Sequence, residues 1–594
     1  MVAMTIRANR TNRAGGATGV IGKHKAQDRF DRLANRFATF AAQVARVPKG
    51  FVSQQEPRSV GIYSRGKQLM AGNILLAGHL VQAPDTPLWD IPAPDADFLA
   101  DAHGFAWADD LVAFGTPAAR VRARDWTRDW IGRFGNGTGP GWTPDLTGRR
   151  LIRWVHHATA LLSGADRAQT DAFYRSLARQ AAYLARRWKA APPGLPQIEA
   201  LTGLVYAGLS LMGMERLVGP AAAGLASACQ ADIDPEGGIQ SRNPEELLEI
   251  LTLLTWAASA MTEAARPVPA EVSAAIRRVT PALRTLRHAD GGLARFHGGE
   301  RGAEGRLDQA LAASGIRPGP APSIAMGYCR LAGRRTTVIV DAASPPDGPS
   351  ARRAHASTTA FELTSGRRPL VVNCGGGTGF GPSWQNAARA TPSHSALCVD
   401  GSSSSRFGLD GQTLDHRTAI LTSRMTLGSE GADLYLAHDG WLASHGLTTS
   451  RSLTLAQDGR RLSGVDTLTA MTAEARRRFQ DLMTATAMTG AGFSIRFHLH
   501  PDVDATLDMA DTAVSMALRS GEIWIFRFSG RATLSLEPSA YLEPGRVNPR
   551  PTAQIVLKAE ARGFETRIGW TLAKAKDTPL AIRDLDRTDR DDFD

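Results

Sequence analysis

Two histidines, an arginine and a tryptophan lie close together in the stretch Ala351–Asp400, which reads ARRAHASTTAFELTSGRRPLVVNCGGGTGFGPSWQNAARATPSHSALCVD. His355 precedes one apolar run, and His394 follows a glycine-rich loop that also brings Trp384 and Arg389. Imidazoles transfer protons near neutral pH, and guanidinium groups bind carboxylates through paired hydrogen bonds. The combination therefore indicates acid–base chemistry on an anionic, sugar-like molecule.

The same stretch predicts strands that would place both histidines at one end of a sheet. Apolar and polar residues alternate in TTAFEL, RPLVVN and HSALCVD, with turns between them. His355 and His394 then lie near strand starts, where side chains can converge on a cleft. The glycine-rich CGGGTGFGPSW lacks the GK[ST] of a phosphate-binding loop. Its Trp384 is expected either to stack on a sugar or to fill the core.

Before this stretch the pattern is helical from about Asp97 to Arg287, with turn signals such as Gly135-Asn136-Gly137 between the helical segments. Short links between helices of similar length predict antiparallel neighbours in a bundle, a solenoid or a toroid. The expected helices cover residues 117–134, 149–163, 168–189, 197–216, 220–232, 244–264 and 270–287.

Beyond a connection rich in glycine and proline at Gly298–Pro322, the period changes to two in runs such as TTVIVDA, FSIRFHLHP and EIWIFRFSG. The fold class predicted is α+β and multidomain, with a helical domain first and an antiparallel β-sandwich second. The expected parts are a basic tail with an amphipathic helix at 1–50, the helical domain at 51–312, the sandwich at 313–575 and an acidic tail at 576–594.

The positive charge of the chain is concentrated at its N-terminus. The net charge is +11, and residues 1–50 hold ten Lys or Arg against two Asp, so eight of the eleven charges lie there. The remainder of the chain therefore does not indicate a nucleic-acid or other general polyanion partner. The four cysteines show no CxxC spacing. No run of 18 apolar residues and no secretory signal are present, which predicts a cytoplasmic protein.

A basic amphipathic helix is expected at residues 27–47. Its apolar side chains recur at helical spacing, and arginines lie outside that stripe. Such a helix can lie on an anionic membrane surface, and it can equally be a first helix that packs on the domain. The apolar stripe consists of Phe30, Leu33, Phe37, Phe40 and Val44.

Several segments resemble the heparinase II/III-like family. They are HGFAWADDL, WTPDLTGRRLIRW, DPEGGIQSRNPEELLEILTLL, LRHADGGLARF, HASTTAFEL, WQNAARATPSHSALCVDG and RFHLHPDV. The resemblance covers most of the chain and implies an incomplete (α/α) toroid followed by an antiparallel β-sandwich. It also implies a polysaccharide lyase, and because such proteins are often exported, the periplasm or cell envelope is the alternative location.

The chemistry that the resemblance implies is β-elimination on a uronic acid within an acidic polysaccharide. A base removes the C5 proton, a positive or hydrogen-bonding group neutralises the carboxylate, and an acid protonates the departing O4. The resemblance makes His355 the base or a sugar contact and places His394 at the same site. Glu246 falls where the acid tyrosine of related lyases usually lies, and Arg242 is expected to bind the carboxylate.

The sequence departs from the family's pattern at several positions. Lyases of the family commonly show H-x-H-x-D ahead of the strand that matches FEL, and here those positions hold Arg353, His355 and Ser357. A carboxylate that binds a metal in some members falls on Asn373. A zinc site made of His355, Asn373 and His394 would lack an anionic ligand, so no tightly held metal or other cofactor is expected.

Other residues admit both a functional and a structural interpretation. Asn243 and Glu246 flank Pro244 in the order of a helix N-cap, its first and its third residue, and Asn243 is also a possible substrate contact. Trp142 and Arg150 belong to an aromatic and cationic cluster suited to an anionic groove or to ordinary helix packing. The cluster also includes Arg149 and Trp154, and Arg389, Trp384 and Arg353 are expected to border the substrate.

Three functions follow from these patterns. The first is a lyase that acts on a uronate-containing glycan. The second is a relative that has lost catalysis and binds an acidic polysaccharide, which the altered Tyr, His and Asp positions favour. The third is a membrane-surface assembly factor that uses the basic N-terminal arm and its amphipathic helix.

Overall fold

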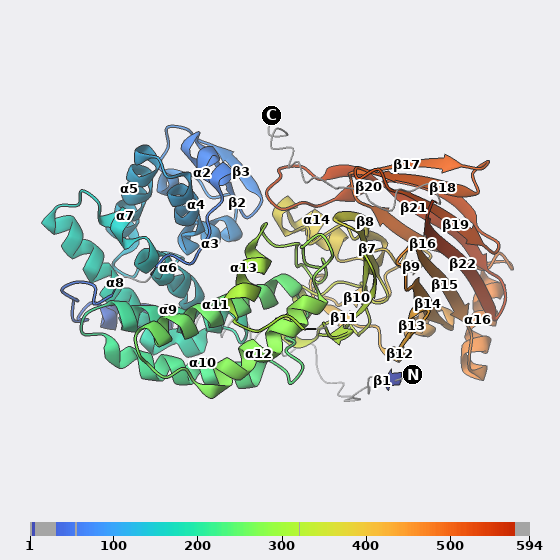
Figure 1. Cartoon of the computed structure of the whole chain (residues 1–594), viewed down its shortest axis with the longest axis horizontal. Helices are drawn as coiled ribbons and strands as arrows, with labels where there is room; N and C mark the ends of the chain where they lie inside the picture. The colour runs from blue at the N-terminus through green and yellow to red at the C-terminus, as the bar shows by residue number, and fades with distance from the viewer. Residues whose placement is uncertain (1–2, 6–30, 32, 54–55, 320, 576–594) are drawn as a thin grey trace.

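A computed structural model describes residues 3–5, 31, 33–53, 56–319 and 321–575. Most of the basic tail, the start of the predicted amphipathic helix at residues 27–30 with Phe30, and the acidic tail lie outside the described residues. Helices occupy one half of the molecule and sheets the other, in the order that hydrophobic periodicity predicts (Figure 1).

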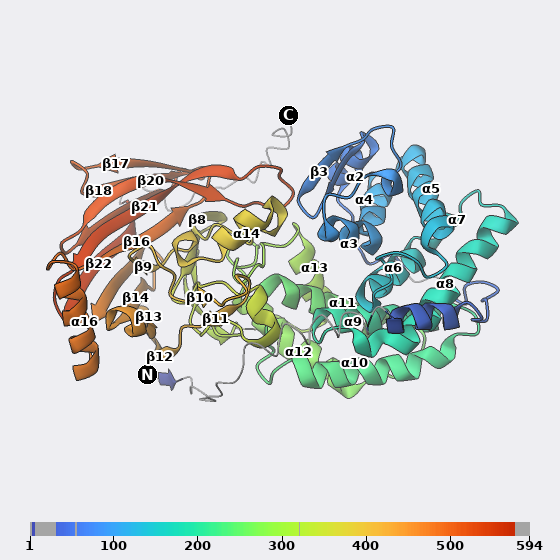
Figure 2. The same cartoon turned by 180° about the vertical axis from the view of Figure 1, so that it is seen from behind.

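The helical half begins with a short helix and a hairpin and continues as antiparallel helices arranged in an arc (Figure 1). Residues 33–42 form a further helix that lies beside α8 (Figure 2). The elements are α2 (Tyr63–Met70), β2 (Asn73–Leu76), β3 (His79–Gln82), α3 (Ala96–Gly104), α4 (Ala106–Phe114), α5 (Pro117–Phe134), α6 (Pro144–His156), α7 (Ala158–Leu162), α8 (Arg167–Arg187), α9 (Leu195–Ser210), α10 (Val218–Asp232), α11 (Pro244–Glu263), α12 (Ala270–Thr285) and α13 (Arg306–Ala313).

Helix ends follow local signals in the sequence. Helix α5 begins and ends at the predicted residues. Its start is fixed by Thr116, which accepts a hydrogen bond from the N–H of Ala119, and by Pro117 at the first helical position. Helices α6 and α9 approach closely at two glycines. A Cβ on Gly148 would lie 2.3 Å from the carbonyl oxygen of Glu199, and one on Gly203 would lie 2.6 Å from Gly148, so larger residues would push the pair apart.

The second half is a sandwich of two antiparallel sheets. One sheet has the order β20-β21-β16-β8-β7-β6-β5-β4, with β9 beside β16, and the other has the order β1-β12-β13-β14-β15-β22-β19-β18-β17. The first comprises β4 (Ile324–Ala325), β5 (Tyr328–Gly333), β6 (Thr336–Asp341), β7 (Phe361–Ser365), β8 (Arg368–Val372), β9 (Leu397–Val399), β16 (Ala491–Leu499), β20 (Thr533–Tyr541) and β21 (Arg550–Ala561). The second comprises β1 (Ala3–Thr5), β12 (Ile420–Gly428), β13 (Gly431–Trp441), β14 (Leu447–Ala456), β15 (Arg461–Thr469), β17 (Val503–Asp508), β18 (Ala513–Leu518), β19 (Ile523–Ser529) and β22 (Glu565–Lys574).

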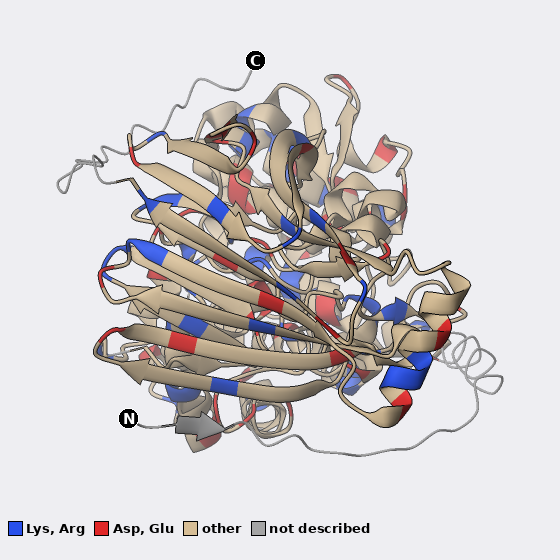
Figure 3. Ribbon diagram, turned by 90° about the vertical axis from the view of Figure 1, so that its right-hand side faces the viewer, with Lys and Arg blue, Asp and Glu red and all other residues tan. Residues whose placement is uncertain are grey.

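Alternate residues of the strands fill the space between the sheets with apolar side chains. One buried ion pair interrupts this core: Arg451 binds both carboxylate oxygens of Asp466 at 2.7 and 3.1 Å, and Trp570 donates its indole N–H to the same carboxylate at 2.8 Å. The outer face of the second sheet carries scattered charges rather than a patch of one sign (Figure 3). Helix α16 (Ala473–Ala485), which the periodicity did not predict, flanks this sheet.

The two halves meet along loops that connect strands of the first sheet. The most buried cation of this junction is Arg295, which donates to the carbonyl oxygens of Asn373, Cys374 and Leu542 and pairs with Glu300 at 2.8 Å. At the far end of the arc, the β2–β3 turn at Gly78 touches the backbone of Gly379. Among the described helices, none is long and apolar enough to cross a membrane.

Candidate functional site

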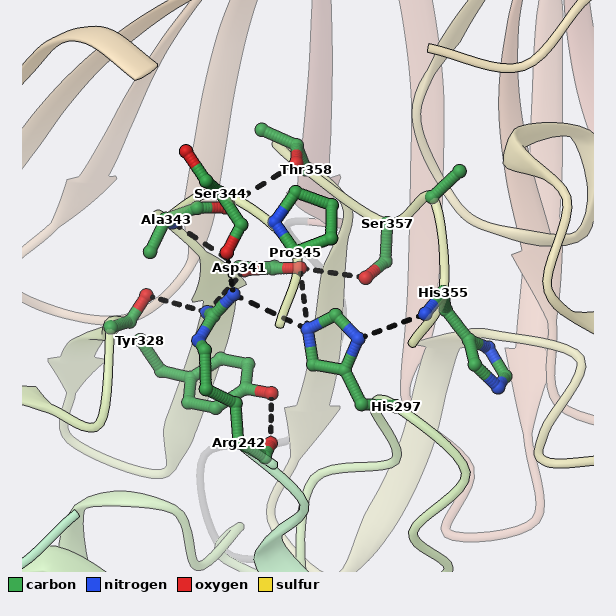
Figure 4. A network of polar contacts seen from close by, with 12 residues as sticks. Arg242, His297, Tyr328, Asp341, Ala343, Ser344, Pro345, His355, Ser357 and Thr358 are labelled. Carbon is green, nitrogen blue, oxygen red and sulfur yellow. Dashed lines mark hydrogen bonds and ion pairs between the residues drawn. The ribbon is translucent and has the colours of Figure 1, made fainter. Parts of the chain in front are cut away.

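Three of the residues that the sequence singled out come together at this junction. Arg242 lies just before α11, His355 lies between β6 and β7, and His394 lies before β9. The structure adds two residues that the sequence analysis missed, His297 from the end of the helical half and Asp341 from the end of β6 (Figure 4). The cluster therefore draws on both halves of the protein.

The guanidinium of Arg242 is fully engaged by the protein. It donates to the carbonyl oxygens of Met326, Ser344 and Gly327 at 3.1, 2.8 and 3.0 Å and pairs with Asp341 through a very short contact (Figure 4). It also lies 4.7 Å from the centre of the ring of Tyr328. A substrate carboxylate would have to displace these partners, so Arg242 is not free to bind a carboxylate in this geometry.

Hydrogen bonds assign the tautomers of the histidines. The backbone N–H of His355 donates to Nδ1 of His297 at 3.1 Å, so the proton of His297 sits on Nε2, 3.4 Å from Asp341. Nδ1 of His394 lies 2.9 Å from the carbonyl oxygen of Ala390 and must donate to it. Nε2 of His394 then accepts from Nδ1 of His355 at 3.2 Å. The only ring nitrogen of His355 left as a base is Nε2, on a side chain that is 2 % exposed.

Burial sets the charge states of this cluster. It lowers the pKa of His355 well below the ordinary value, helped by His394, and lowers the pKa of His394 to about 4. Burial also lowers the pKa of His297, although Asp341 opposes this shift. Burial opposes ionisation of Asp341, but Arg242 and hydrogen bonds from His297 and Ser357 hold the pKa of Asp341 well below its usual range. The cluster therefore contains the ion pair of Arg242 and Asp341, next to three neutral imidazoles.

Stability should fall as the pH is lowered from about 6.5 to 5. In the unfolded chain these histidines take up protons near pH 6.5, whereas the folded protein keeps them neutral, so the unfolded state binds more protons and gains up to about 1.4 kcal/mol per pH unit for each histidine. Burial raises the pKa of Glu199 and Glu245 to about 7 and that of Asp110 to about 6, which acts in the opposite direction. The histidines outnumber these carboxylates, since His103, His156, His438 and His498 also have pKa values lowered to about 3 by burial. A melting temperature that increases as the pH is lowered from 6.5 to 5 would contradict this prediction.

The remaining residues expected around the substrate are mostly held by the protein itself. Asn373 accepts from the N–H of Ser395 at 3.1 Å and donates to Glu362 at 3.4 Å. Arg389 is buried and donates to the carbonyl oxygens of Ala354 and Ala351, both at 2.9 Å, rather than pairing with an acid. Arg353 and Trp384 are exposed, and Trp384 lies on the short helix α14 (Pro382–Ala388).

Trp142 and Arg150 lie inside the core of the helical half and line no exposed groove. Arg150 donates to Gln180 at 2.8 Å and to the carbonyl oxygens of His103 and Gly141, both at 3.1 Å. Burial lowers the pKa of Arg150 to about 9. The indole of Trp142 packs beside it, so the helix-packing interpretation describes both residues.

The start of α11 has the expected cap. The side-chain oxygen of Asn243 accepts from the N–H groups of Glu245 and Glu246 at 2.9 and 3.1 Å, with Pro244 at the first helical position. The cap interpretation of Asn243 is thereby confirmed. Glu246 is half-buried beside it.

The residues aligned with a zinc site do not fit that metal. His355 and His394 bind each other through the nitrogens that would face a shared ion, and the amide of Asn373 is engaged with Ser395 and Glu362. A neutral amide in place of a carboxylate is a poor ligand for Zn²⁺. Within the described residues, no group of three or more His, Cys, Asp or Glu side chains is arranged to hold a metal ion.

The geometry defines a two-domain protein in which an arc of helices is joined to an antiparallel sandwich through a buried polar junction. Solved structures share this fold. Heparinase III matches with a TM-score of 0.66 at 13 % identity, over 93 % of this chain and 91 % of that one. A heparan sulfate lyase HepC mutant from Pedobacter heparinus matches with a TM-score of 0.57 at 14 % identity, over 95 % and 92 %.

Sequence comparison gives the family. Residues 317–571 match the model described as heparinase II/III-like, C-terminal. The FtsZ-localized protein C of Caulobacter vibrioides (strain NA1000 / CB15N) is 31 % identical over 550 residues, which are 89 % of this chain and 91 % of that protein. The chain belongs to the heparinase II/III-like family.

Proposed function

We propose that this chain is a heparinase II/III-like protein that has lost lyase chemistry. The observation that carries the proposal is the burial of His297, His355 and His394, whose exposed fractions do not exceed 2 %. A general base must come within about 3 Å of the carbon-bound proton that it removes. A sugar ring cannot reach imidazoles that contact almost no solvent-accessible space.

Two further observations support the same proposal. Glu246 stands where the resemblance expects the acid tyrosine, and a neighbouring carboxylate would repel a uronate rather than neutralise it. Arg242 is already neutralised by Asp341. The polar groups of the junction thus join the two halves instead of facing a substrate.

The purified protein is expected to leave heparan sulfate and a panel of other uronate polymers intact. The unsaturated product of β-elimination absorbs in the ultraviolet, so the assay follows that absorbance together with direct binding to each polymer. A rise in absorbance that His355→Ala abolishes would contradict the proposal and restore the lyase. A rise that His355→Ala leaves unchanged, in protein purified free of other lyases, would also contradict the proposal and would mean that the base is another residue.

A second function, at a membrane surface, is favoured by the helix at residues 33–42. Ala38 and Ala42 are buried against the helical half, while Leu33, Phe37 and Phe40 are 64 %, 75 % and 71 % exposed. The stripe continues to Val44, which is 88 % exposed. The amphipathic helix predicted from the sequence is therefore present, but its apolar stripe faces away from the domain.

The helix is attached to the helical half through its polar side chains. Arg187 of α8 donates to Asn35 at 2.8 Å and to Asp31 at 2.9 Å, and Gln43 donates to the carbonyl oxygen of Asn136 at 3.4 Å. This anchorage holds the apolar stripe outward on a rigid base. Exposed Arg36, Arg46 and Lys49 adjoin the stripe, and cations beside an apolar face favour anionic lipid headgroups.

We therefore propose that the protein lies on an anionic membrane and associates there with FtsZ. The identity shared with an FtsZ-localized protein over nine-tenths of its length supports the partner. FtsZ from the same organism should co-sediment with phosphatidylglycerol vesicles when this protein is present. If the protein binds the vesicles and FtsZ stays in solution, the proposed partner is wrong.

A further inference from the structure

A small pocket in the helical half lies away from the buried histidine cluster. It encloses about 160 Å³ between the middle of α11, helix α13 and the segment that precedes α2. Trp256 and two threonines of α11 form one side, and the guanidinium-bearing residues Arg58 and Arg306 come from the other two elements. Its lining thus converges from three separate parts of the chain.

The two arginines leave donors unused. Arg58 pairs with Glu263, and Arg306 pairs with Glu249, in each case through Nη2 alone. Nε of both residues is buried without a hydrogen-bond partner among the described residues. An unpaired buried donor costs about 1–3 kcal/mol, so each guanidinium would gain from rearranging around an added acceptor.

The aromatic wall of the pocket leads to a second set of unpaired polar atoms. The ring of Trp256 lies 5.5 Å from that of His156, which lies 5.0 Å from the ring of Tyr206. Both ring nitrogens of His156 are buried without a hydrogen-bond partner among the described residues. The hydroxyl of Tyr206 is buried too, and Arg58 acts on its pKa partly as a hydrogen-bond donor. Arg58 is close enough to act on the pKa of both residues, although burial is the larger cause of each shift.

The size and chemistry of the pocket restrict its ligand. Its volume of about 160 Å³ suits one small organic molecule rather than a polymer. The guanidinium N–H groups of Arg58 and Arg306 that Glu263 and Glu249 leave free match a carboxylate or phosphate, and an indole face matches the apolar side of a sugar ring. The hydroxyls of Thr252 and Thr255 donate to the carbonyl oxygens of Leu248 and Thr252 and still have acceptor capacity for ligand hydroxyls.

From this convergence we infer that the pocket between α11, α13 and residues 57–60 binds a single sugar that carries a phosphate or carboxylate. Arg58 and Arg306 bind the anionic group, and Trp256 contacts the ring. This site is independent of the proposed loss of lyase chemistry and of membrane binding. A ligand here would join α11 to the segment that links the N-terminal helix to the rest of the domain.

Isothermal titration calorimetry with D-glucose 6-phosphate and D-gluconate tests the inference, with D-glucose as the neutral control. At least one anionic probe should bind the full-length protein with a Kd at least ten-fold below that of glucose. Tighter binding of glucose 6-phosphate would indicate a phosphate-bearing ligand, and tighter binding of gluconate would indicate a carboxylate-bearing one. Equal binding of glucose, or no binding of any probe at millimolar concentration, would overturn the inference.

Variants locate the binding. Arg306→Gln and Trp256→Leu should each raise the Kd of the probe that binds by at least ten-fold. Arg277→Gln, on the exposed side of α12, should leave this Kd unchanged. Melting temperatures show whether each variant is folded, and Gln309→Ala at the rim provides a milder second test because its side chain is exposed. Binding that survives both Arg306→Gln and Trp256→Leu in folded protein would place the ligand elsewhere and overturn the assignment.

Discussion

Replacement of Arg242 by methionine is expected to lower the melting temperature of the protein by about 6–10 °C. The substitution leaves the carboxylate of Asp341 buried with no compensating cation, and breaking a buried ion pair in this way costs about 3–5 kcal/mol. For a cooperative unit of about 250 residues, each kcal/mol corresponds to about 2 °C. Scanning calorimetry measures the shift.

Two further variants separate the ion pair from general damage. Arg478→Met breaks an exposed pair with Glu474 on α16 and is expected to change stability by no more than about 0.5 kcal/mol. The double variant Arg242→Met/Asp341→Asn removes both charges and should recover part of the loss. If Arg242→Met shifts the melting temperature no more than Arg478→Met does, the junction is not held by this pair.

The second large effect concerns the exposed stripe of the N-terminal helix. The double variant Phe37→Ser/Phe40→Ser should weaken binding to phosphatidylglycerol vesicles by about 10²–10⁴-fold, because each phenylalanine buried in lipid contributes about 1.5–3 kcal/mol. Both side chains already point outward, so the substitutions remove no packing within the protein. Vesicle co-sedimentation measures the change.

A control double variant removes exposed apolar side chains elsewhere on the protein. Leu421 and Leu427 of β12 are 49 % and 51 % exposed, and Leu421→Ser/Leu427→Ser should leave vesicle binding unchanged. Added salt should weaken the wild-type interaction, because cations adjoin the stripe. Equal losses in the two double variants would show that the helix at 33–42 is not the membrane-binding element.

Much of the fold could be predicted from local patterns. The start of α5 is encoded by Thr116-Pro117 and the start of α11 by Asn243-Pro244, and both helices begin where these caps place them. Strand alternation likewise predicts the sandwich. The family resemblance adds the arrangement of the two halves, which periodicity alone leaves open among several architectures.

The candidate site was only partly predictable because its contacts are distant in sequence. Asp341 meets Arg242 across 99 residues, and His297 meets the backbone of His355 across 58. No local pattern marks His297 or Asp341 as partners. The burial of Arg150 could have been predicted from the sequence. Arg150 lies four residues from both Leu146 and Trp154, so all three side chains share the buried face of α6.

Chemical access to the histidine cluster tests the account most directly. Diethyl pyrocarbonate modifies neutral imidazoles that solvent can reach, and peptide mass spectrometry identifies the modified residues. Exposed His416 should react rapidly in the native protein, while His297, His355 and His394 should stay unmodified until the protein is unfolded. Modification of His355 at the rate of His416 would show an open cleft with an available base, and it would contradict the proposal that this family member has lost lyase chemistry.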